Sequence, residues 1–357
     1  MKKEHGGNVY KVSRETGMDI KDIIDFSANI NPLGIPASGK KAIEESIEGL
    51  VNYPDPDYID FRKAIGRLHD LDYASVVPGN GAIDSLFAAV EAVQPKKVLV
   101  SVPSFVEYEK AVEKSGAEYV PSYRLEDEAY TFNVDRFIND MKTDIDLGVI
   151  CNPNNPTGDI IGPEDIEKIL KHCQSIGAYL LVDEAFMEFA ERLGQETCIG
   201  LTEKYKGLIV SRSLTKYYAV PGLRCGYLIT KDVNILEKLL SKAQPWKLNH
   251  LADRFSQSVV FDEAYNSQTG AWFREENSSL KKALDSIPGL KVNDSYANYL
   301  FFKYEGGADM AKSLLERGIM IRTCHNYDGM GENYFRVAIK DKASNEKLIM
   351  ALKQICE

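Results

Sequence analysis

Five short apolar runs, each bounded by turn residues, recur between helical patterns in the middle of the chain. They cover residues 98–102, 147–151, 179–183, 208–211 and 226–230. Runs of this length fit strands that are buried on both faces of a largely parallel sheet. The intervening segments repeat apolar residues at helical spacing and cover residues 58–68, 82–93, 106–115 and 163–174. We therefore expect an α/β domain with helical crossovers.

The pattern changes beyond residue 235 to a long charged helical region and then to strand-like runs at 299–303, 319–322 and 334–339, with a helix from Ser344. This order suits a smaller α+β domain. The 357 residues exceed the size at which one core usually stops growing. We expect three parts: an N-terminal segment (1–51) that packs on the small domain, a large domain (52–245) and a small C-terminal domain (246–357).

Composition restricts the class of partner. The net charge of −10 disfavours a nucleic-acid or anionic-membrane surface, because both partners need a basic footprint. No apolar segment approaches the ~18 residues of a membrane span. The six cysteines form no CxxC pair, so neither a zinc site nor a disulfide framework is indicated. We expect a cytoplasmic protein without a metal, which binds any anionic ligand through a local cluster of positive charge.

The stretch SRSLTKYYAVPGLRCGY, residues 211–227, concentrates hydroxyl and cationic groups after an apolar run. Lys216 could form an imine if its surroundings keep the amine neutral. Arg224 offers a bidentate fork for a phosphate, and Ser213 offers a hydroxyl. Taken alone, the stretch also fits a surface lysine and a paired arginine.

Three further motifs lie at the ends of apolar runs or at a helix start. Asp183 ends the run LLVD, where ligands bind in open α/β sheets, although a helix N-cap or a structural ion pair would also explain it. Asn155 lies in CNPNNPTG, a turn that could present an amide into a cleft. The glycine turn PGNGAID, residues 78–84, leads into a helix whose free amides suit an anion.

These motifs, in this order and with the aromatic Phe105 in Pro103–Ser104–Phe105, resemble the fold-type I aminotransferase superfamily over essentially the whole chain. The resemblance implies pyridoxal 5′-phosphate as cofactor, and a large domain with a mainly parallel sheet of seven strands beside a smaller α+β domain. It implies that Lys216 forms the Schiff base, that Asp183 lies under the pyridine nitrogen and that Asn155 bonds the ring hydroxyl. The remaining implied contacts are the phosphate ligands and the stacking ring: Ala82, Ile83, Ser213, Arg224 and Phe105.

The resemblance also implies a homodimer with shared sites. Tyr53, in Asn52–Tyr53–Pro54–Asp55, matches the tyrosine that reaches the phosphate from the partner subunit. One position departs from the pattern, because this chain has Phe186 where many relatives carry a tyrosine. The missing phenol leaves Asn155 as the main partner of the ring hydroxyl.

Within the superfamily the chain resembles histidinol-phosphate aminotransferases and, more closely, the threonine-phosphate decarboxylases of cobalamin biosynthesis. The closer match rests on HGGN at 5–8, DFSANINPLG at 25–34 and RTCHNY at 322–327. It implies decarboxylation of L-threonine O-3-phosphate to (R)-1-amino-2-propanol O-2-phosphate. The substrate pocket would be lined by His5, Gly6, Asn29, Asn155, Arg322 and Arg336.

A doubly anionic substrate fits the residue types, because two guanidinium forks can hold a phosphate and a carboxylate. Taken singly, Arg322 and Arg336 would more often be surface ion pairs, and His5 a disordered terminal residue. Orientation would select the reaction: a decarboxylase must turn the α-carboxylate out of the cofactor plane, whereas a transaminase exposes the C–H bond. A phosphate-recognising transaminase, which needs a keto-acid acceptor, is the rival. A cofactor-binding regulator is disfavoured, since the chain has neither spare length nor a basic segment for a DNA-binding module.

Overall fold

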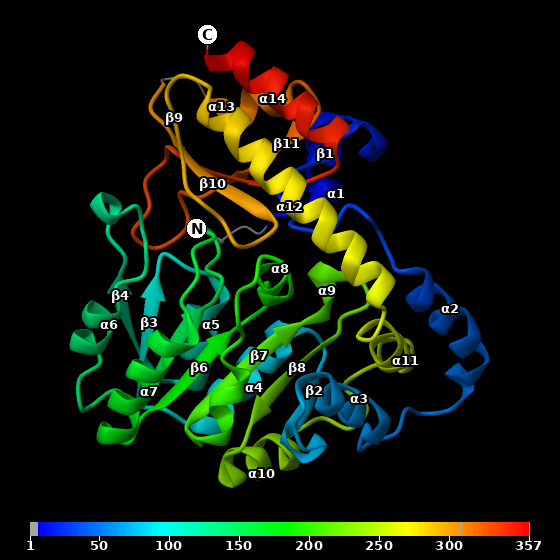
Figure 1. Cartoon of the computed structure of the whole chain (residues 1–357), viewed down its shortest axis with the longest axis vertical. Coiled ribbons are helices and arrows are strands. Elements are labelled where there is room, and N and C mark those ends of the chain that lie inside the picture. The colour runs from blue at the N-terminus through cyan, green and yellow to red at the C-terminus, as the bar shows by residue number, and fades with distance from the viewer. Residues whose placement is uncertain (1–5, 307–308, 357) are drawn as a thin grey trace.

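The computed structural model describes residues 6–306 and 309–356, and it contains a mixed sheet of seven strands in the lower body of Figure 1. The central strands are parallel, and the two at one end, β8 and β2, are antiparallel to their neighbours. In sheet order the strands are β2 (Val76–Gly79), β8 (Gly226–Thr230), β7 (Leu208–Ser213), β6 (Tyr179–Asp183), β5 (Leu147–Cys151), β3 (Lys97–Val102) and β4 (Glu118–Tyr123). The predicted fold class is confirmed.

Helices cover both faces of this sheet because successive strand residues point to opposite sides. Leu181 packs in one apolar cluster, and Leu180 and Val182 pack in the other. The helices on the Leu181 face are α4 (Ala82–Val93), α5 (Glu107–Ser115) and α10 (Val233–Ser241). Those that pack into the opposite cluster include α3 (Ile59–His69), α6 (Val134–Asp140) and α7 (Pro163–Ile176).

Within the large sheet, the two strands that the sequence pattern did not predict, β2 and β4, are its two edges. Pro78 lies in β2 and Pro121 in β4. Proline cannot donate to a hydrogen-bond ladder, so strands that contain it are confined to edges and lack the usual strand signature.

The second body, at the top of Figure 1, holds an antiparallel sheet of four strands and a pair of short parallel strands. The run 319–322 was predicted as one strand, and this is wrong: β11 pairs with β1, while β12 joins the other sheet. The strands are β1 (Ile24–Asp25), β9 (Leu290–Val292), β10 (Tyr299–Tyr304), β11 (Ile319–Met320), β12 (Arg322–Thr323) and β13 (Tyr334–Ala338).

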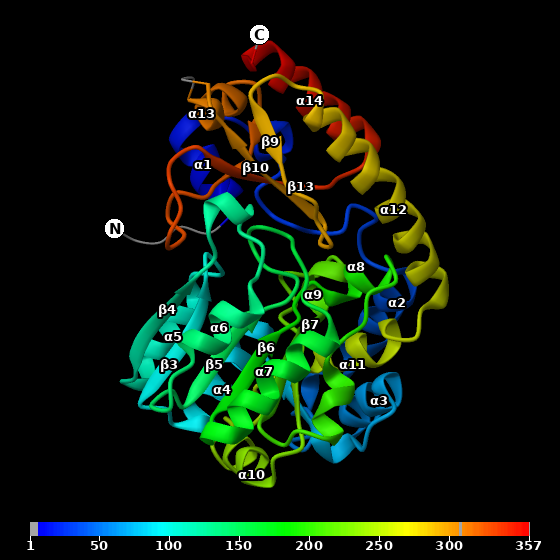
Figure 2. The ribbon, with the colours of Figure 1, turned by 60° about the vertical axis from the view of Figure 1, so that its left-hand side comes forward.

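The long helix α12 (Glu263–Asp285) runs along one side of the molecule from the smaller sheet to α11, as Figure 2 shows. The N-terminal residues contact both bodies, since β1 pairs with β11 and α2 packs on α11. The division into residues 1–51, 52–245 and 246–357 therefore stays a prediction. The remaining helices are α1 (Val9–Thr16), α2 (Ala37–Ser46), α8 (Met187–Glu191), α9 (Leu214–Tyr217), α11 (His250–Val259), α13 (Met310–Leu315) and α14 (Lys342–Cys356). Within the described ranges, no helix has the length and apolar character needed to cross a membrane.

The register of the large sheet brings the predicted motifs to one edge. Cys151 pairs with Asp183, and Asp183 pairs with Ser211. The carboxyl ends of β5, β6 and β7 therefore lie side by side, which is where open α/β sheets bind ligands.

Candidate active site

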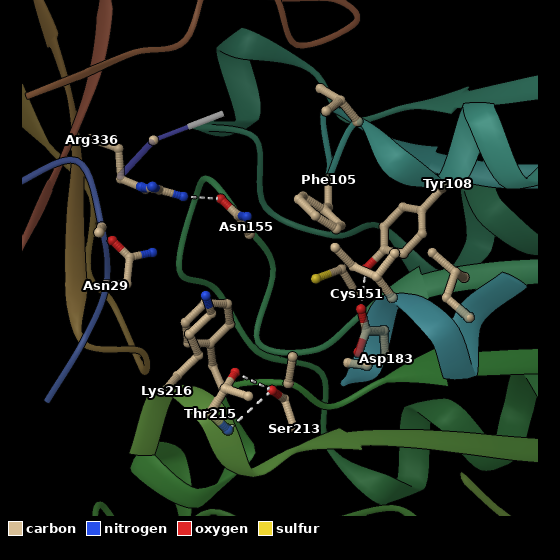
Figure 3. A pocket seen from close by; sticks show the side chains of 18 of the residues that line it. Asn29, Phe105, Tyr108, Cys151, Asn155, Asp183, Ser213, Thr215, Lys216 and Arg336 are labelled. Carbon is tan, nitrogen blue, oxygen red and sulfur yellow. Dashed lines mark hydrogen bonds between the residues drawn. The ribbon is translucent and has the colours of Figure 1, made fainter. Parts of the chain in front are cut away.

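A cavity of about 240 Å³ lies at this edge, and its lining also includes Arg322 of β12 and Arg336 of β13 in the smaller sheet. Figure 3 shows Arg336 and Asn29 at one end and Asp183 with Tyr108 at the other, with Lys216, Asn155 and Phe105 between them. Almost all of the predicted site residues line this cavity: Gly6, Asn29, Ala82, Ile83, Phe105, Asn155, Asp183, Ser213, Lys216, Arg224, Arg322 and Arg336.

Asp183 is a buried carboxylate with one satisfied oxygen. Its Oδ2 accepts a hydrogen bond of 2.8 Å from the hydroxyl of Tyr108, whereas its Oδ1 has no partner among the described residues. Burial raises the pKa of Asp183 to about 6, and the Tyr108 hydrogen bond opposes this rise. Asp183 is not a helix cap, because Phe186 precedes α8. A buried carboxylate oxygen without a donor calls for a cationic or N–H ligand.

Lys216 belongs to α9, which begins directly after β7. Burial lowers the pKa of its amine to about 8, and the positive charges of Arg224 and Arg336 act in the same direction. The amine is therefore partly neutral near physiological pH, as a nucleophilic lysine requires.

The start of α4 forms an anion site. Gly81 precedes the helix with φ 84°, and a Cβ at this position would collide with the guanidinium of Arg224. Arg224 itself has φ 63° and donates to the Pro221 carbonyl at 3.2 Å. The side chain of Ser213 caps α9 and lies 2.8 Å from the hydroxyl of Thr215. Backbone amides, a helix dipole and an arginine thus converge there.

Asn155 connects the two bodies of the molecule. Its Oδ1 accepts a hydrogen bond of 2.5 Å from Arg336 Nη1 and one of 3.1 Å from the hydroxyl of Tyr327. The amide nitrogen of Asn155 remains as the donor for a ligand group.

The two arginines predicted to bind the substrate are buried, so the alternative of surface ion pairs is wrong. Arg322 is 7% exposed and Arg336 is 5% exposed. They face each other in register on β12 and β13, and like charges directly opposite destabilise a sheet. Arg322 donates to Asn326 at 2.8 Å, and Arg336 Nη2 donates to the carbonyl of Ser27 at 2.7 Å. The described residues that line the cavity include three arginines and one lysine but a single carboxylate, that of Asp183.

The N-terminal motifs contribute through backbone and amide groups. Gly7 N–H donates to Ser27 Oγ at 2.8 Å, and a Cβ on Gly6 would collide with the Ser27 carbonyl. Asn29 is buried, and its Oδ1 lacks a partner among the described residues. His5 lies outside the residues that the structure describes.

Three predicted or noted aromatic residues take different places. Phe105 lines the cavity and packs edge-on against Tyr108, with ring centroids 5.8 Å apart. Phe186 also lines the cavity, and its ring packs edge-on against Tyr299 with centroids 5.1 Å apart. Tyr53 is 79% exposed, stacks on Trp246 and is not among the cavity-lining residues.

Sequence reasoning missed Tyr108 and did not assign Tyr327. Tyr108 follows Phe105 by three residues, and it enters the cavity from the start of α5. Phe105 precedes α5, so no shared helix face marks Tyr108 in the sequence. Tyr327 lies in the RTCHNY motif and could have been included on that ground.

Comparison with known proteins agrees with this geometry. The sequence profile of the family described as aminotransferase class I and II matches residues 21–352. The threonine-phosphate decarboxylase of Salmonella typhimurium is 35% identical over 98% of this chain and 96% of its own length. A histidinol-phosphate aminotransferase of Caldanaerobacter subterraneus is 32% identical over 92% of each chain. The solved structure of the histidinol-phosphate aminotransferase from Clostridium acetobutylicum superposes with a TM-score of 0.87 at 34% identity, over 92% of this chain and 98% of that one. The profile match over nearly the whole length, on a fold with the expected sheet, means that the chain belongs to the aminotransferase class I and II family.

Proposed function

We propose that this protein decarboxylates L-threonine O-3-phosphate to (R)-1-amino-2-propanol O-2-phosphate in cobalamin biosynthesis, with pyridoxal 5′-phosphate as cofactor. The observation that carries the proposal is the charge of the cavity: four cationic side chains and one carboxylate among its described lining residues, in a chain of net charge −10. Such a site suits two phosphate groups, one from the cofactor and one from the substrate.

The cavity fits the cofactor on structural grounds. The unpartnered Oδ1 of Asp183 would accept a hydrogen bond from a protonated pyridine nitrogen. The Ala82 and Ile83 amides, Ser213 and Arg224 would hold the phosphate, with Phe105 stacked on the ring. Asn155 would donate to the ring hydroxyl. When bound, pyridoxal phosphate supplies an electron sink for the bond that breaks.

Lys216 would serve as the covalent attachment point and as a proton carrier. Its lowered pKa, about 8, keeps a fraction of the amine neutral for attack on a carbonyl. The same amine lines the cavity, where it would move a proton at Cα of the substrate.

Arg322 and Arg336 would hold the substrate phosphate, together with His5, Gly6 and Asn29. A phosphate in this arginine pair leaves the α-carboxylate outside it. Held in this way, the substrate would present its bond between Cα and the carboxylate for cleavage, for which the cofactor would supply the electron sink. Unphosphorylated threonine should be a poor substrate, because its own carboxylate would enter the arginine pair.

We also propose a cytoplasmic homodimer in which Tyr53 reaches the cofactor phosphate of the partner. The exposure of Tyr53 on Trp246 supports this, because the pair lies outside its own cavity. Large apolar side chains nearby in sequence are also exposed, namely Ile47, Leu50 and Val51. An exposed apolar group of this kind favours an interface.

The second candidate is a histidinol-phosphate aminotransferase, favoured by the 34% identity to the Clostridium acetobutylicum structure. The test supplies carboxyl-labelled L-threonine O-3-phosphate alone in one tube, and histidinol phosphate with 2-oxoglutarate in another. We expect labelled carbon dioxide in the first tube without any acceptor. Glutamate in the second tube with no release in the first would establish the transaminase instead.

A further inference from the structure

Tyr108 is a fully buried side chain that lines the cavity at the end where Asp183 lies. It is 1% exposed, and its hydroxyl donates to Asp183 Oδ2 at 2.8 Å, as the dashed line in Figure 3 marks. The other oxygen of Asp183 has no partner among the residues that the structure describes. The two carboxylate oxygens are thus unequal: this chain satisfies one, and the other is left for a ligand.

The hydroxyl of Tyr108 stays a donor at every working pH. Burial and the neighbouring charge of Asp183 raise the pKa of Tyr108 well above its usual value of 10. The position of the ring is also fixed, because Phe105 packs against it at 85° between the ring planes. The donor and the proposed stacking ring of the cofactor are therefore held by the same short segment.

The Ala185 amide and the Ser211 hydroxyl also lower the pKa of Asp183, but the effect of Tyr108 is the largest of the three. Cys151 is a neutral thiol whose pKa burial raises to about 12, and its Sγ donates to the Pro153 carbonyl. Glu184, the next residue along the chain, accepts hydrogen bonds from Thr197 and the amide of Cys198 and faces Arg212. Its charge therefore has partners of its own.

We propose that Tyr108 is a positioning residue that keeps the proton of the Asp183–pyridine pair on the ring nitrogen. The inference rests on the proposed function, in which Asp183 pairs with the cofactor ring. A hydrogen bond to Oδ2 makes the carboxylate a weaker base, because it stabilises the charged form. Without that bond the carboxylate draws the shared proton to itself, and the ring becomes a weaker electron sink.

The test compares Tyr108→Phe with Tyr58→Phe. Tyr58 is a matched control, since it is buried and its hydroxyl donates to the Leu248 carbonyl at 2.9 Å, but it does not line the cavity. For Tyr108→Phe we expect kcat to fall about tenfold to hundredfold with KM changed less than about twofold, as expected for a lost hydrogen bond to a charged group. The absorbance of the bound cofactor should titrate about one pH unit higher, since the pair binds its proton more tightly. Tyr58→Phe should show neither effect.

A double variant separates an action through Asp183 from a purely structural effect. In an Asp183→Asn background, Tyr108→Phe should cause little further loss of kcat, because the base on which it acts is gone. Full additivity of the two losses would overturn the proposal. If Tyr108→Phe does not fold, a fluorinated tyrosine at position 108 keeps the shape and strengthens the donor. The cofactor absorbance should then titrate at lower pH, and an unchanged midpoint refutes the role.

Failure of this inference and failure of the proposed function give different results. If Asp183→Asn leaves cofactor affinity and absorbance unchanged, Asp183 does not pair with the ring and the proposed site is wrong. If Asp183→Asn changes both while Tyr108→Phe matches Tyr58→Phe, the site stands and the role of Tyr108 is overturned.

Discussion

Lys216 should destabilise the cofactor-free protein in a manner that depends on pH. Its pKa falls from 10.5 to about 8 on folding. Below pH 8 both the folded and the unfolded protein carry the proton, so the folded state bears the full cost of the buried ammonium. Between pH 8 and 10.5 the folded protein releases its proton first, and stability therefore rises with pH. A difference of about 2.5 pKa units corresponds to ~3 kcal/mol, and we take about 2–3 kcal/mol because the amine faces the cavity.

The perturbation is Lys216→Met, which keeps the length of the side chain and removes the charge. Urea unfolding of the cofactor-free proteins should find the variant more stable than the wild type by about 2–3 kcal/mol at pH 7, plus a constant packing difference. This advantage should decline through pH 8–10.5. Lys216→Arg is the control, because a guanidinium keeps its charge over this pH range. The difference in free energy of unfolding between Lys216→Arg and Lys216→Met should therefore not change with pH. If the difference in free energy of unfolding between the wild type and Lys216→Met does not change with pH, the reasoning is refuted.

The remaining predictions concern the anion sites and the subunit contact. Arg224→Ala should weaken cofactor binding by about one to two orders of magnitude, measured by equilibrium titration of the cofactor-free protein, and unchanged affinity excludes a direct contact. Gly81→Ala should also weaken cofactor binding, because the new Cβ meets Arg224. Gly116→Ala is the control, since Gly116 has φ 78° and nothing lies within 4 Å of the added Cβ. It should cost only about 1 kcal/mol of stability and leave cofactor affinity intact. Arg336→Ala should lower kcat as well as raise KM, since orientation selects the bond; an effect on KM alone contradicts this. Tyr53→Ala should reduce cofactor affinity in a dimer, and a fully active monomer by sedimentation excludes the shared site.

Three strands that are buried on both faces match their predicted bounds to the residue, and the predictions for β3 and β7 are one and two residues short, because an uninterrupted apolar run marks a strand more clearly than its ends. Leu147–Cys151 and Tyr179–Asp183 are examples. The failures have a common cause, which is that pairing is decided by partners distant in sequence. The edge strands with proline have one neighbour each, and the run 319–322 divides because β1 takes its first half.

The candidate site follows the same rule. Lys216 and Asp183 lie in motifs that can be recognised without knowledge of the fold, so the sequence alone predicts them as residues of the site. Tyr108 could not, because its importance comes from a contact with a residue 75 positions away. The burial of Arg322 and Arg336 is likewise a property of the assembled sheet. Considered one at a time in the sequence, the two arginines resemble surface charges.

The hydrogen bond from Arg336 to Asn155 links the proposed substrate site to the proposed cofactor site. The side-chain oxygen of Asn155 accepts hydrogen bonds from Arg336 and Tyr327, which belong to the smaller body. In the proposed site, the arginine that would bind the substrate phosphate would also set the orientation of this amide, and so the direction in which its N–H groups donate. A phosphate that draws Arg336 away from Asn155 would free the amide to turn, because Tyr327 alone would then restrain it. In the proposed site, substrate binding and the hydrogen bonding of the cofactor would therefore be coupled through one guanidinium group, and such coupling acts equally in both directions.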